Sequence, residues 1–476
     1  MSGETTAPER DFAAGRSRAA GAEVFALVIV WCRDEPWRVG EVLLVPPGPA
    51  LVVGRESSEP GEPPKASFGQ QRPRHWRASP PFAMKTLSRR QLSVVATDAE
   101  RLLVKNHGKS LLLKNGEQTL EAACVPGDLL QVGAQLLLLC ARRPQKLASE
   151  SAAEPRFEFG EPDTHGIVGE SPAVWGLRER FEFVARRPGH VLIRGSSGAG
   201  KELVAQAIHT LSGSGRPLIA RNAATIPDSL VDAELFGSAR NYPNAGMPER
   251  PGLVGQADGS SLFLDEIGEL SPASQAHLLR VLDRGEYQRL GESRSRTSQF
   301  RLLAATSRHS HELRDDFAAR FKHQLSVADL DARREDVPLL VNHLLRSAAS
   351  AGDVAAQRLF PGGDLRAYPE LPLELMHELV SRSYRTNVRE LDNLLAEAIT
   401  PSWVGAETES RAEPSPQSSA EGPTPERIQS CLDANNGLIE RSWRELGLSS
   451  RFALLRLIKK HRLVIRRRPG EPDRRR

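Results

Sequence analysis

The chain has 476 residues, 39% of them hydrophobic and 26% charged, with a formal net charge of +4. This composition is typical of soluble globular domains joined by polar linkers, and the length predicts about three domains. No apolar stretch approaches the ~20 residues that span a bilayer, and residues 1–18 are not followed by the apolar core of a signal peptide, so we expect a cytoplasmic protein without a membrane partner. The four cysteines lie far apart with no Cys-x-x-Cys pair, which excludes a disulfide framework.

Residues 145–164 and 401–424 are rich in Pro, Ser, Glu and Ala and are predicted to be linkers, because they cannot bury enough apolar surface to fold alone. We expect a disordered segment at 1–22, followed by domains at 23–144, 165–400 and 425–476. The expected fold class is multidomain, with an all-β sandwich, then an α/β phosphate-loop domain with a helical lid, then an all-α domain. Residues 56–81 are polar and are predicted to form a long loop inside the first domain.

Short apolar runs separated by turn signals predict the all-β sandwich of the first domain. The expected strands are 24–32, 41–45, 51–53, 91–96, 102–104, 110–113 and 129–140. The residues Gly54, Arg55, Ser88, Arg89, Asn106, Asn115, Gly116 and 126–128 resemble those of a forkhead-associated (FHA) domain. The resemblance implies that a phosphothreonine protein or kinase binds at Arg55, Ser88, Arg89 and Asn106. Gln91 stands where that family has a buttressing His. The alternative is a plain sandwich whose Gly, Asn and Ser only form turns.

Two motifs in the central domain predict an ATP site. An apolar run at 191–194 leads into Gly195, Ser196, Ser197, Gly198, Ala199, Gly200, Lys201 and Glu202. The glycines let backbone N–H groups approach phosphate oxygens, and Lys201 would reach the terminal phosphates at the start of a helix. A second apolar run ends in Asp265 and Glu266, which offer one carboxylate for Mg²⁺ and one to polarise a water. The alternative is an ordinary strand–turn–helix corner.

Residues 195–202, 232–237, 257–270 and 333–338 resemble, motif by motif, the AAA+ module of sigma-54-dependent activators, the bacterial enhancer-binding proteins. The resemblance implies an ATPase α/β subdomain at 165–340, a helical lid at 341–400, and a homo-oligomer between a dimer and a hexamer. It also implies an RNA polymerase sigma factor as partner. Glu202 fits, since this family carries Glu after the phosphate-loop lysine.

The same resemblance implies a role for individual residues. Lys201 would hold phosphates, Asp265 the Mg²⁺, and Glu266 the attacking water, with Asn222 restraining Glu266. Arg389 would sense the nucleotide from the lid. Arg314 and Arg320 occupy the places of arginines that act on a neighbouring subunit's ATP, although their spacing alone favours a solvated helix face with ordinary arginines.

Two positions depart from that family. Residues 241–246 replace the loop that reads GAFTGA, with Pro243 where Phe is expected and Asn244 where Thr is expected. Proline fixes φ and removes a donor, so this tip differs in conformation as well as chemistry. Ser307 stands where the family has an Asn that senses the γ-phosphate. We therefore predict that the protein does not open sigma-54 promoters by itself.

The last domain is basic, with 14 Lys or Arg against 6 Asp or Glu in residues 425–476, which favours nucleic acid as a partner. Residues 443–461 resemble a Fis-type helix-turn-helix, with Ser449 as the cap of the recognition helix. The resemblance implies DNA contacts from Ser449, Ser450, Arg451, Arg456, Lys459 and Lys460. An amphipathic protein-binding bundle is the alternative.

Together these features predict a transcription regulator that binds ATP, Mg²⁺ and DNA and responds to threonine phosphorylation through its first domain. Whether it is an ATPase stays open at this point. The alternative is a DNA-bound adaptor or repressor that does not remodel polymerase and whose ATP site only controls oligomerisation.

Overall fold

The computed structural model describes residues 22–56, 66–97, 100–147, 155–307, 313–399 and 425–435, together with Ser442, Glu445, Leu446, Leu454 and Ile458. The chain forms two compact units, Met1–Glu397 and Ala398–Arg476, which we describe separately. Within the described ranges, no helix has both the length and the apolar character needed to cross a bilayer.

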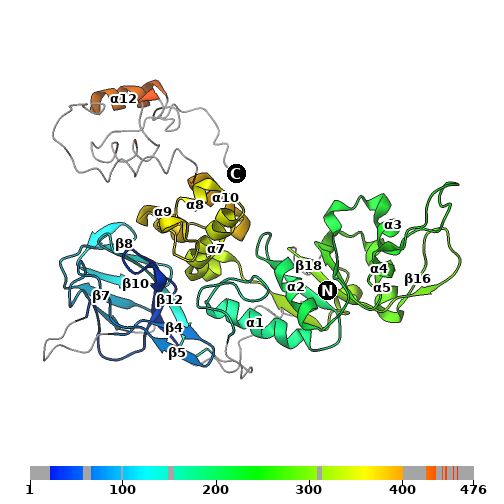
Figure 1. The fold of residues 1–476 in the computed structure, drawn as a ribbon, viewed down its shortest axis with the longest axis horizontal. Coiled ribbons are helices and arrows are strands. Elements are labelled where there is room, and N and C mark those ends of the chain that lie inside the picture. The colour runs from blue at the N-terminus through cyan, green and yellow to red at the C-terminus, as the bar shows by residue number, and fades with distance from the viewer. Residues whose placement is uncertain are drawn as a thin grey trace, which may run out of the picture. The chain divides into compact units, whose positions relative to one another are not determined.

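The first domain consists of two antiparallel sheets (Figure 1). In spatial order, the strands of the larger sheet are β5 His75–Ala78, β4 Gly69–Arg72, β2 Val42–Val45, β1 Glu23–Cys32, β12 Leu136–Pro144, β11 Leu129–Val132, β8 Leu112–Lys114 and β9 Glu117–Thr119. Those of the smaller sheet are β10 Glu121–Cys124, β7 Leu102–Asn106, β6 Leu92–Ala96 and β3 Leu51–Val53. Leu27 and Ile29 of β1 pack in one buried cluster with Leu92 and Val94 of β6. The predicted sandwich is therefore present, and a short helix, η1 (Pro36–Arg38), joins β1 to β2.

Two details of the sandwich differ from prediction. Residues 56–81 were expected to be one loop, but they contain the hairpin β4–β5, which turns at Arg74 with a φ of 61°. All four residues of β5 are exposed, so this edge strand lacks the apolar alternation that identifies a strand in a sequence. The expected strand 129–140 is two strands, β11 and β12, because the chain turns at Gly133 with a φ of 54°.

The central domain is a parallel sheet with helices on both faces, which confirms the predicted α/β fold. Its strands, in spatial order, are β14 Ile219–Asn222, β15 Ser261–Asp265, β18 Arg301–Thr306, β13 Val191–Arg194 and β19 His323–Ser326. Alternate residues of β13 enter the two cores: Val191 and Ile193 pack towards α1 and α2, and Leu192 packs on the opposite side. The helices are α1 Pro172–Ala185, α2 Lys201–Leu211, α3 Val231–Phe236, α4 Gly252–Gln256, α5 Pro272–Arg284 and α6 Asp315–Ala318. Shorter elements are η2 Ala223–Thr225, η3 Asp228–Leu230, η4 Ile267–Glu269 and the hairpin β16 Glu286–Tyr287 with β17 Arg296–Thr297.

The predicted helical lid follows the sheet. It comprises η6 Leu330–Asp336, α7 Val337–Ser350, α8 Val354–Gln357, η7 Pro361–Gly363, α9 Leu373–Ser381 and α10 Asn387–Ala398. In the second unit the structure describes one helix, α12 (Pro425–Ala434), whose Ile428 and Leu432 pack with Leu454 and Ile458. An all-α domain was predicted there, and its recognition helix lies outside the described residues.

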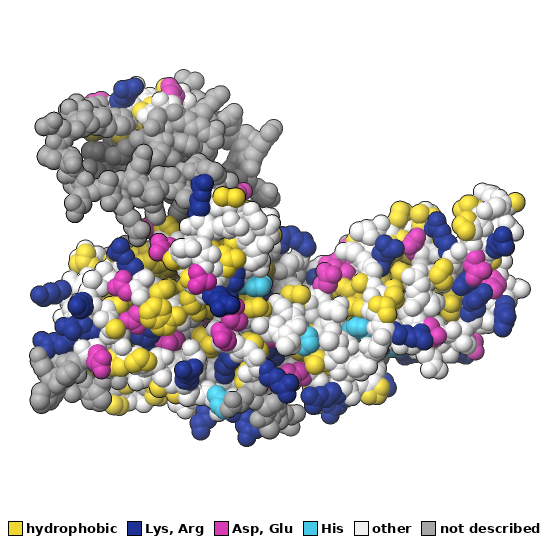
Figure 2. Space-filling view, in the orientation of Figure 1, with side chains coloured by type: hydrophobic (Ala, Val, Ile, Leu, Met, Phe, Trp, Pro, Cys, Tyr) yellow, Lys and Arg dark blue, Asp and Glu magenta, His cyan; other side chains and the backbone are white. Residues whose placement is uncertain are grey.

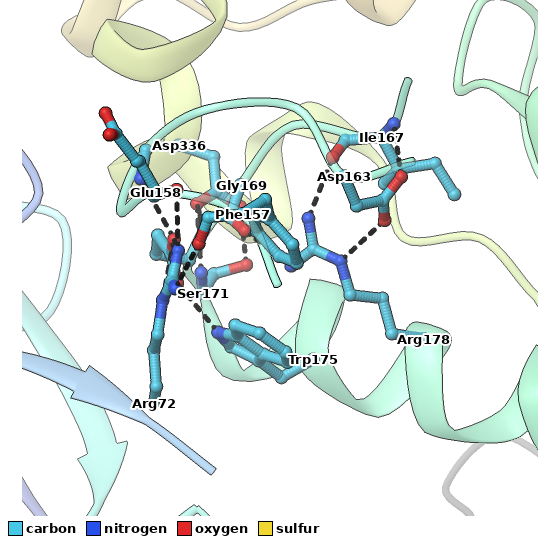
Figure 3. Close-up of polar contacts among 12 residues, drawn as sticks. Arg72, Phe157, Glu158, Asp163, Ile167, Gly169, Ser171, Trp175, Arg178 and Asp336 are labelled. Atoms are coloured by element: carbon cyan, nitrogen blue, oxygen red, sulfur yellow. Dashed lines mark hydrogen bonds and ion pairs between the residues drawn. The ribbon is translucent and has the colours of Figure 1, made fainter. Parts of the chain in front are cut away.

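The sandwich and the central domain meet in a polar and aromatic contact, which we call the seam (Arg72, Arg143, residues 157–163, Glu170, Trp175 and Glu335). Figure 3 shows the part of the seam around Arg72, Phe157 and Trp175. Residues 157–163 were predicted to lie in a linker, but the Phe157 ring stacks on Trp175 of α1 with centroids 5.9 Å apart. The Arg72 guanidinium of β4 lies 4.7 Å from the Phe157 centroid and donates to the Phe157 carbonyl at 2.8 Å. Arg72 Nε also lies 3.1 Å from Glu170 Oε2.

A second arginine completes the seam. Arg143 of β12 is 1% exposed, pairs with Glu335 Oε2 at 3.0 Å, and donates to the Glu170 carbonyl at 2.7 Å. Burial raises the pKa of Glu335 to about 7, although the charge of Arg143 opposes that rise. Trp31 Nε1 of β1 donates to the Leu371 carbonyl of the lid at 2.9 Å. The sandwich therefore contacts both the α/β subdomain and its lid.

Candidate functional site

The candidate nucleotide site is the loop 195–200 between β13 and α2, which we call the phosphate loop. Gly198 and Gly200 have φ values of 74° and 103°, a region that side chains rarely adopt. Gly200 is the residue before the first turn of α2, so the helix N-terminus opens directly onto the loop. A Cβ at Gly198 would lie 2.2 Å from the Thr386 carbonyl oxygen of the lid, so the backbone here approaches more closely than any side chain allows.

Lys201, the first residue of α2, is 6% exposed and lies inside this loop. Its ammonium donates to the Gly195 carbonyl at 2.9 Å and to the Ser196 carbonyl at 3.3 Å, and it lies 3.4 Å from Glu266 Oε1. A lysine held by carbonyls of the loop is placed to exchange those weak partners for phosphate oxygens. Glu202, the next residue, is exposed in the first turn of α2.

The carboxylates predicted to serve Mg²⁺ and water lie beside this lysine, at the end of β15. Asp265 Oδ1 is buried and has no hydrogen-bond partner among the described residues, while Oδ2 accepts from Asn222 Nδ2 at 3.4 Å. Burial raises the pKa of Asp265, although the charge of Lys201 opposes it. A buried oxygen without a donor is an unfavourable place for a carboxylate alone and a favourable one for a divalent cation, which takes oxygen ligands. Asp265 therefore fits the predicted Mg²⁺ ligand.

Glu266 has different partners from those predicted. Its Oε2 accepts from the Ser307 backbone N–H at 3.0 Å and from the Ser307 hydroxyl at 2.8 Å. Burial favours a raised pKa for Glu266, but these hydrogen bonds and the charge of Lys201 outweigh it, so the net pKa is below its ordinary value. Asn222, which was expected to restrain Glu266, contacts Asp265 instead.

The lid closes over the phosphate loop from the opposite side. Arg389 Nη1 lies 3.3 Å from Ser197 Oγ, the Asn387 amide donates to the Ser197 carbonyl at 3.1 Å, and the Val388 N–H donates to the Gly198 carbonyl at 3.2 Å. Arg333 of η6, 5% exposed, lies 3.3 Å from the Ala199 carbonyl. Arg389 was predicted to be here. Asn387 and Arg333 were missed: Arg333 lies in the motif noted at 333–338 and Asn387 lies two residues before Arg389, but neither was given a role.

The structure does not bring Arg314 and Arg320 to the chain's own phosphate loop. Arg314 Nη2 pairs with Asp316 Oδ2 at 2.7 Å, and Arg320 Nη2 pairs with Asp283 Oδ2 at 3.1 Å. Both arginine side chains are 42% exposed.

A second predicted site lies at one end of the sandwich, which we call the sandwich tip (Arg55, Ser88, Arg89, Gln91, Asn106 and Ser110). Gln91 is 0% exposed, accepts from the Ser88 N–H at 3.1 Å, and donates to Asn106 Oδ1 at 2.7 Å and to the Ser110 carbonyl at 3.0 Å. Asn106 Nδ2 donates to that same carbonyl at 2.9 Å, so its amide is turned inwards.

The sandwich tip also contains two arginines, Arg55 and Arg89, and the Ser88 hydroxyl, which accepts from the Lys109 N–H at 3.0 Å. The Arg55 N–H donates to the Ser88 carbonyl at 3.2 Å, which places Arg55 beside the Ser88 turn. Residues 85–114 contain seven Lys or Arg and two acidic residues. Lys and Arg side chains gather along the edge of the sandwich in Figure 2. This end of the domain suits an anion, although Asn106 is not oriented to grip a peptide.

The loop at 241–246 forms a closed turn. The Asn241 N–H donates to the Met247 carbonyl and the Gly246 N–H donates to Asn241 Oδ1, both at 2.9 Å. A Cβ at Gly291 would lie 2.3 Å from the Tyr242 ring, so this ring packs against the backbone of the neighbouring hairpin loop. The predicted DNA-contacting residues (Ser449, Ser450, Arg451, Arg456, Lys459 and Lys460) lie outside the described residues.

We compared the chain with known protein families and proteins. Residues 167–331 match the family described as "Sigma-54 interaction domain". The chain is 38% identical over 254 residues to the Nif-specific regulatory protein of Bradyrhizobium diazoefficiens, which covers 52% of this chain and 41% of the relative. It is 37% identical over 244 residues to the transcriptional regulatory protein ZraR of Escherichia coli, which covers 49% of this chain and 52% of the relative. The chain thus spans about half the length of these relatives.

Among solved structures, the chain is similar to NtrX from Brucella abortus in complex with ADP. The sequence identity is 26% and the TM-score is 0.45, over 63% of this chain and 69% of NtrX. The same protein in complex with ATP gives an identity of 27% and a TM-score of 0.44, over 62% and 69%.

Proposed function

We propose that this chain, in which residues 167–331 match the family described as "Sigma-54 interaction domain", is a transcription regulator that binds Mg·ATP and DNA. One observation carries the proposal: Lys201, the adjacent Asp265 and Glu266, and Arg389 come from three separate stretches of chain and converge on the phosphate loop. The relatives named as regulators support the assignment, although the chain spans about half their length.

Each residue of the site has a distinct part in binding. Lys201 and the N–H groups of the phosphate loop would hold the β- and γ-phosphates, and Arg389 would reach them from the lid. Asp265 would hold Mg²⁺, which neutralises charge on the transferring phosphoryl group. Glu266 would polarise the attacking water.

A binding measurement tests the ATP site. Lys201→Ala should weaken Mg·ATP binding about 100-fold, because a buried phosphate charge loses its partner, while Lys322→Ala, at an exposed position, should not change it. Isothermal titration of the full chain gives both values. Equal affinity in Lys201→Ala and the wild type would remove the phosphate loop from the proposal.

ATP turnover separates this function from the alternative of an adaptor or repressor whose ATP site only controls oligomerisation. A remodelling ATPase hydrolyses ATP, and Glu266→Gln should abolish turnover while retaining binding, since the amide cannot accept a proton from water. ATP-dependent assembly without turnover, unchanged in Glu266→Gln, would favour the adaptor.

The closed turn at 241–246 supports a partner surface different from the GAFTGA tip of the family. We infer that the protein does not melt sigma-54 promoters alone and acts on another holoenzyme or through a partner subunit. Purified sigma-54 holoenzyme, ATP and a supercoiled target promoter provide the test. Robust ATP-dependent open-complex formation by this protein alone would contradict the inference.

The flanking domains are assigned by resemblance and charge. The sandwich tip would take a phosphothreonine segment at Arg55, Ser88 and Arg89, and the basic residues 425–476 would bind DNA. Ser450→Ala and Arg451→Ala should weaken specific DNA binding, whereas deletion of residues 469–476 should mainly reduce the salt dependence. If residues 425–476 bind no DNA at low salt even when dimerised, the helix-turn-helix assignment fails.

A further inference from the structure

The carboxylate of Glu266, which follows strand β15, is held by Ser307, which follows the neighbouring strand β18. Strands β15 and β18 are parallel neighbours, with Leu264 opposite Ala304, so Ser307 follows β18 at the same edge where Glu266 follows β15. Two donors of Ser307, its backbone N–H at 3.0 Å and its hydroxyl at 2.8 Å, converge on one atom, Glu266 Oε2. A carboxylate oxygen that accepts two hydrogen bonds from one residue is held in both position and direction.

The backbone at Glu266 is also specialised. Its φ is 49° and its ψ is 48°, the left-handed region, which is costly for any residue except glycine. Such a conformation persists only where the surrounding contacts impose it, and it is a frequent property of functional residues. The position of this carboxylate is therefore a requirement of the site.

The second oxygen of Glu266 has a different partner. Oε1 lies 3.4 Å from Lys201 Nζ, and the same ammonium is bonded to carbonyls of the phosphate loop. Asn222 contacts Asp265 and not Glu266. The two carboxylate oxygens of Glu266 therefore have different partners. Oε2 accepts from Ser307, and Oε1 faces the Lys201 ammonium, which bound phosphates would attract.

We propose that Ser307 is the positioning residue for Glu266: it holds Oε2 in place, so that Oε1 becomes available to the attacking water when bound phosphates draw Lys201 away. The inference rests on the proposed ATP site. In the step, the water oxygen forms a bond to the γ-phosphorus, and the bond from that phosphorus to the ADP oxygen breaks. The proton of the water passes to Glu266 Oε1 and from there to the released phosphate or solvent, which balances the hydrolysis.

Three variants of the full chain test this role with a turnover assay at saturating Mg·ATP. Ser307→Ala removes the hydroxyl and keeps the N–H, and we expect kcat to fall about tenfold with KM unchanged. Ser307→Thr restores the hydroxyl and should stay within about twofold of the wild type. Ser350→Ala, at an exposed position at the end of α7, is the matched control and should leave kcat and KM unchanged.

The split between kcat and KM, together with rescue by threonine, distinguishes positioning from a general loss of structure. A merely structural defect would raise KM as well and would not be restored by Ser307→Thr.

The outcomes separate the two proposals. If the wild type binds no nucleotide, the proposed ATP site fails. If the wild type binds nucleotide but does not turn it over, the role of Ser307 in hydrolysis fails and the ATP site stands. A wild-type kcat in Ser307→Ala, or a loss of kcat that Ser307→Thr does not restore, would overturn the role of Ser307 and leave the ATP site intact.

Discussion

The phosphate loop and the sandwich tip both place polar residues at the ends of strands, but their hydrogen-bonding groups are used in opposite ways. At the phosphate loop, Lys201 rests on backbone carbonyls and Asp265 keeps a buried oxygen without a donor among the described residues. At the tip, Gln91 and Asn106 satisfy each other and the neighbouring backbone. The first region keeps its groups available for a ligand, and the second uses most of its groups to hold its own shape.

The difference shows which residues a ligand can engage without loss of stability. A ligand at the phosphate loop replaces weak partners, so binding can add to stability. A ligand that required Asn106 at the tip would first have to break the bond to Gln91. We therefore expect Arg55 and the surrounding cations to carry recognition at the tip.

The largest effect on the free energy of unfolding should come from Gly198→Ala. The new side chain would meet the Thr386 carbonyl at 2.2 Å, at a φ of 74°, so we expect a loss of about 4 kcal/mol and displacement of the lid. Gly213→Ala is the control, since Gly213 has a φ of 73° but no neighbour within 4 Å, and should cost about 1 kcal/mol. Urea unfolding measures both, and equal losses would show that the contact with the lid is unimportant.

Gln91→Ala should be the next most damaging change. It leaves the Ser88 N–H and Asn106 Oδ1 without their buried partner, which should cost about 3 kcal/mol. Nucleotide affinity should not change, because the two regions are separate. Gln118→Ala, at an exposed position of β9, should cost less than about 0.5 kcal/mol. If Gln91→Ala cost as little as Gln118→Ala, the hydrogen bonds of Gln91 within the sandwich tip would not contribute to stability.

The seam gives a pH-dependent effect of intermediate size. The pKa of Glu335 is raised from 4.5 to about 7, so between these values the unfolded chain loses a proton that the folded chain keeps, and stability falls as pH rises. Glu335→Gln cannot ionise and should match the wild type near pH 4.5, then exceed its stability by up to about 3 kcal/mol at pH 8. Denaturation at both pH values tests this, and a constant difference between the two proteins would contradict it.

Arg55→Ala should have the smallest effect on stability, within about 0.5 kcal/mol. Its binding effect should be clear: affinity for a degenerate phosphothreonine peptide library should fall at least about tenfold, because the phosphate loses a guanidinium. Asn106→Ala is the informative partner, since it should cost stability more than affinity. A greater loss of affinity in Asn106→Ala than in Arg55→Ala would show that Asn106 turns outwards when a peptide binds.

The sequence was sufficient for contacts that repeat a local pattern. Strands 191–194 and 261–264 were predicted from their apolar runs, and parallel strands bring Lys201 and Asp265 to one edge of the sheet. It was insufficient where the partner is set by tertiary packing. Asn387 reaches the phosphate loop because the lid folds back onto it; the nearby Arg389 was expected at the nucleotide, but the sequence does not show that Asn387 bonds to the Ser197 carbonyl.

The sequence also did not show which residues are hydrogen-bonded to each other. Ser307 and Gln91 were identified as unusual residues at their positions, but their partners could not be assigned without coordinates. The hairpin β4–β5 escaped prediction for a different reason, since an edge strand with four exposed residues carries no apolar alternation. Pattern-based prediction succeeds where burial imposes a period and fails where side-chain partners or sheet edges decide the structure.

The seam has a consequence for modularity. A gene fragment that starts at residue 165 would encode every strand of the central sheet, yet its product would have Glu170 without Arg72 and the face of Trp175 without Phe157. A different sensor domain grafted at that boundary would have to bring its own arginine and aromatic ring to the same place. The sandwich therefore cannot easily be replaced by another domain. A new ligand specificity would have to evolve by changes on the surface of the sandwich, with the contacts of the seam retained.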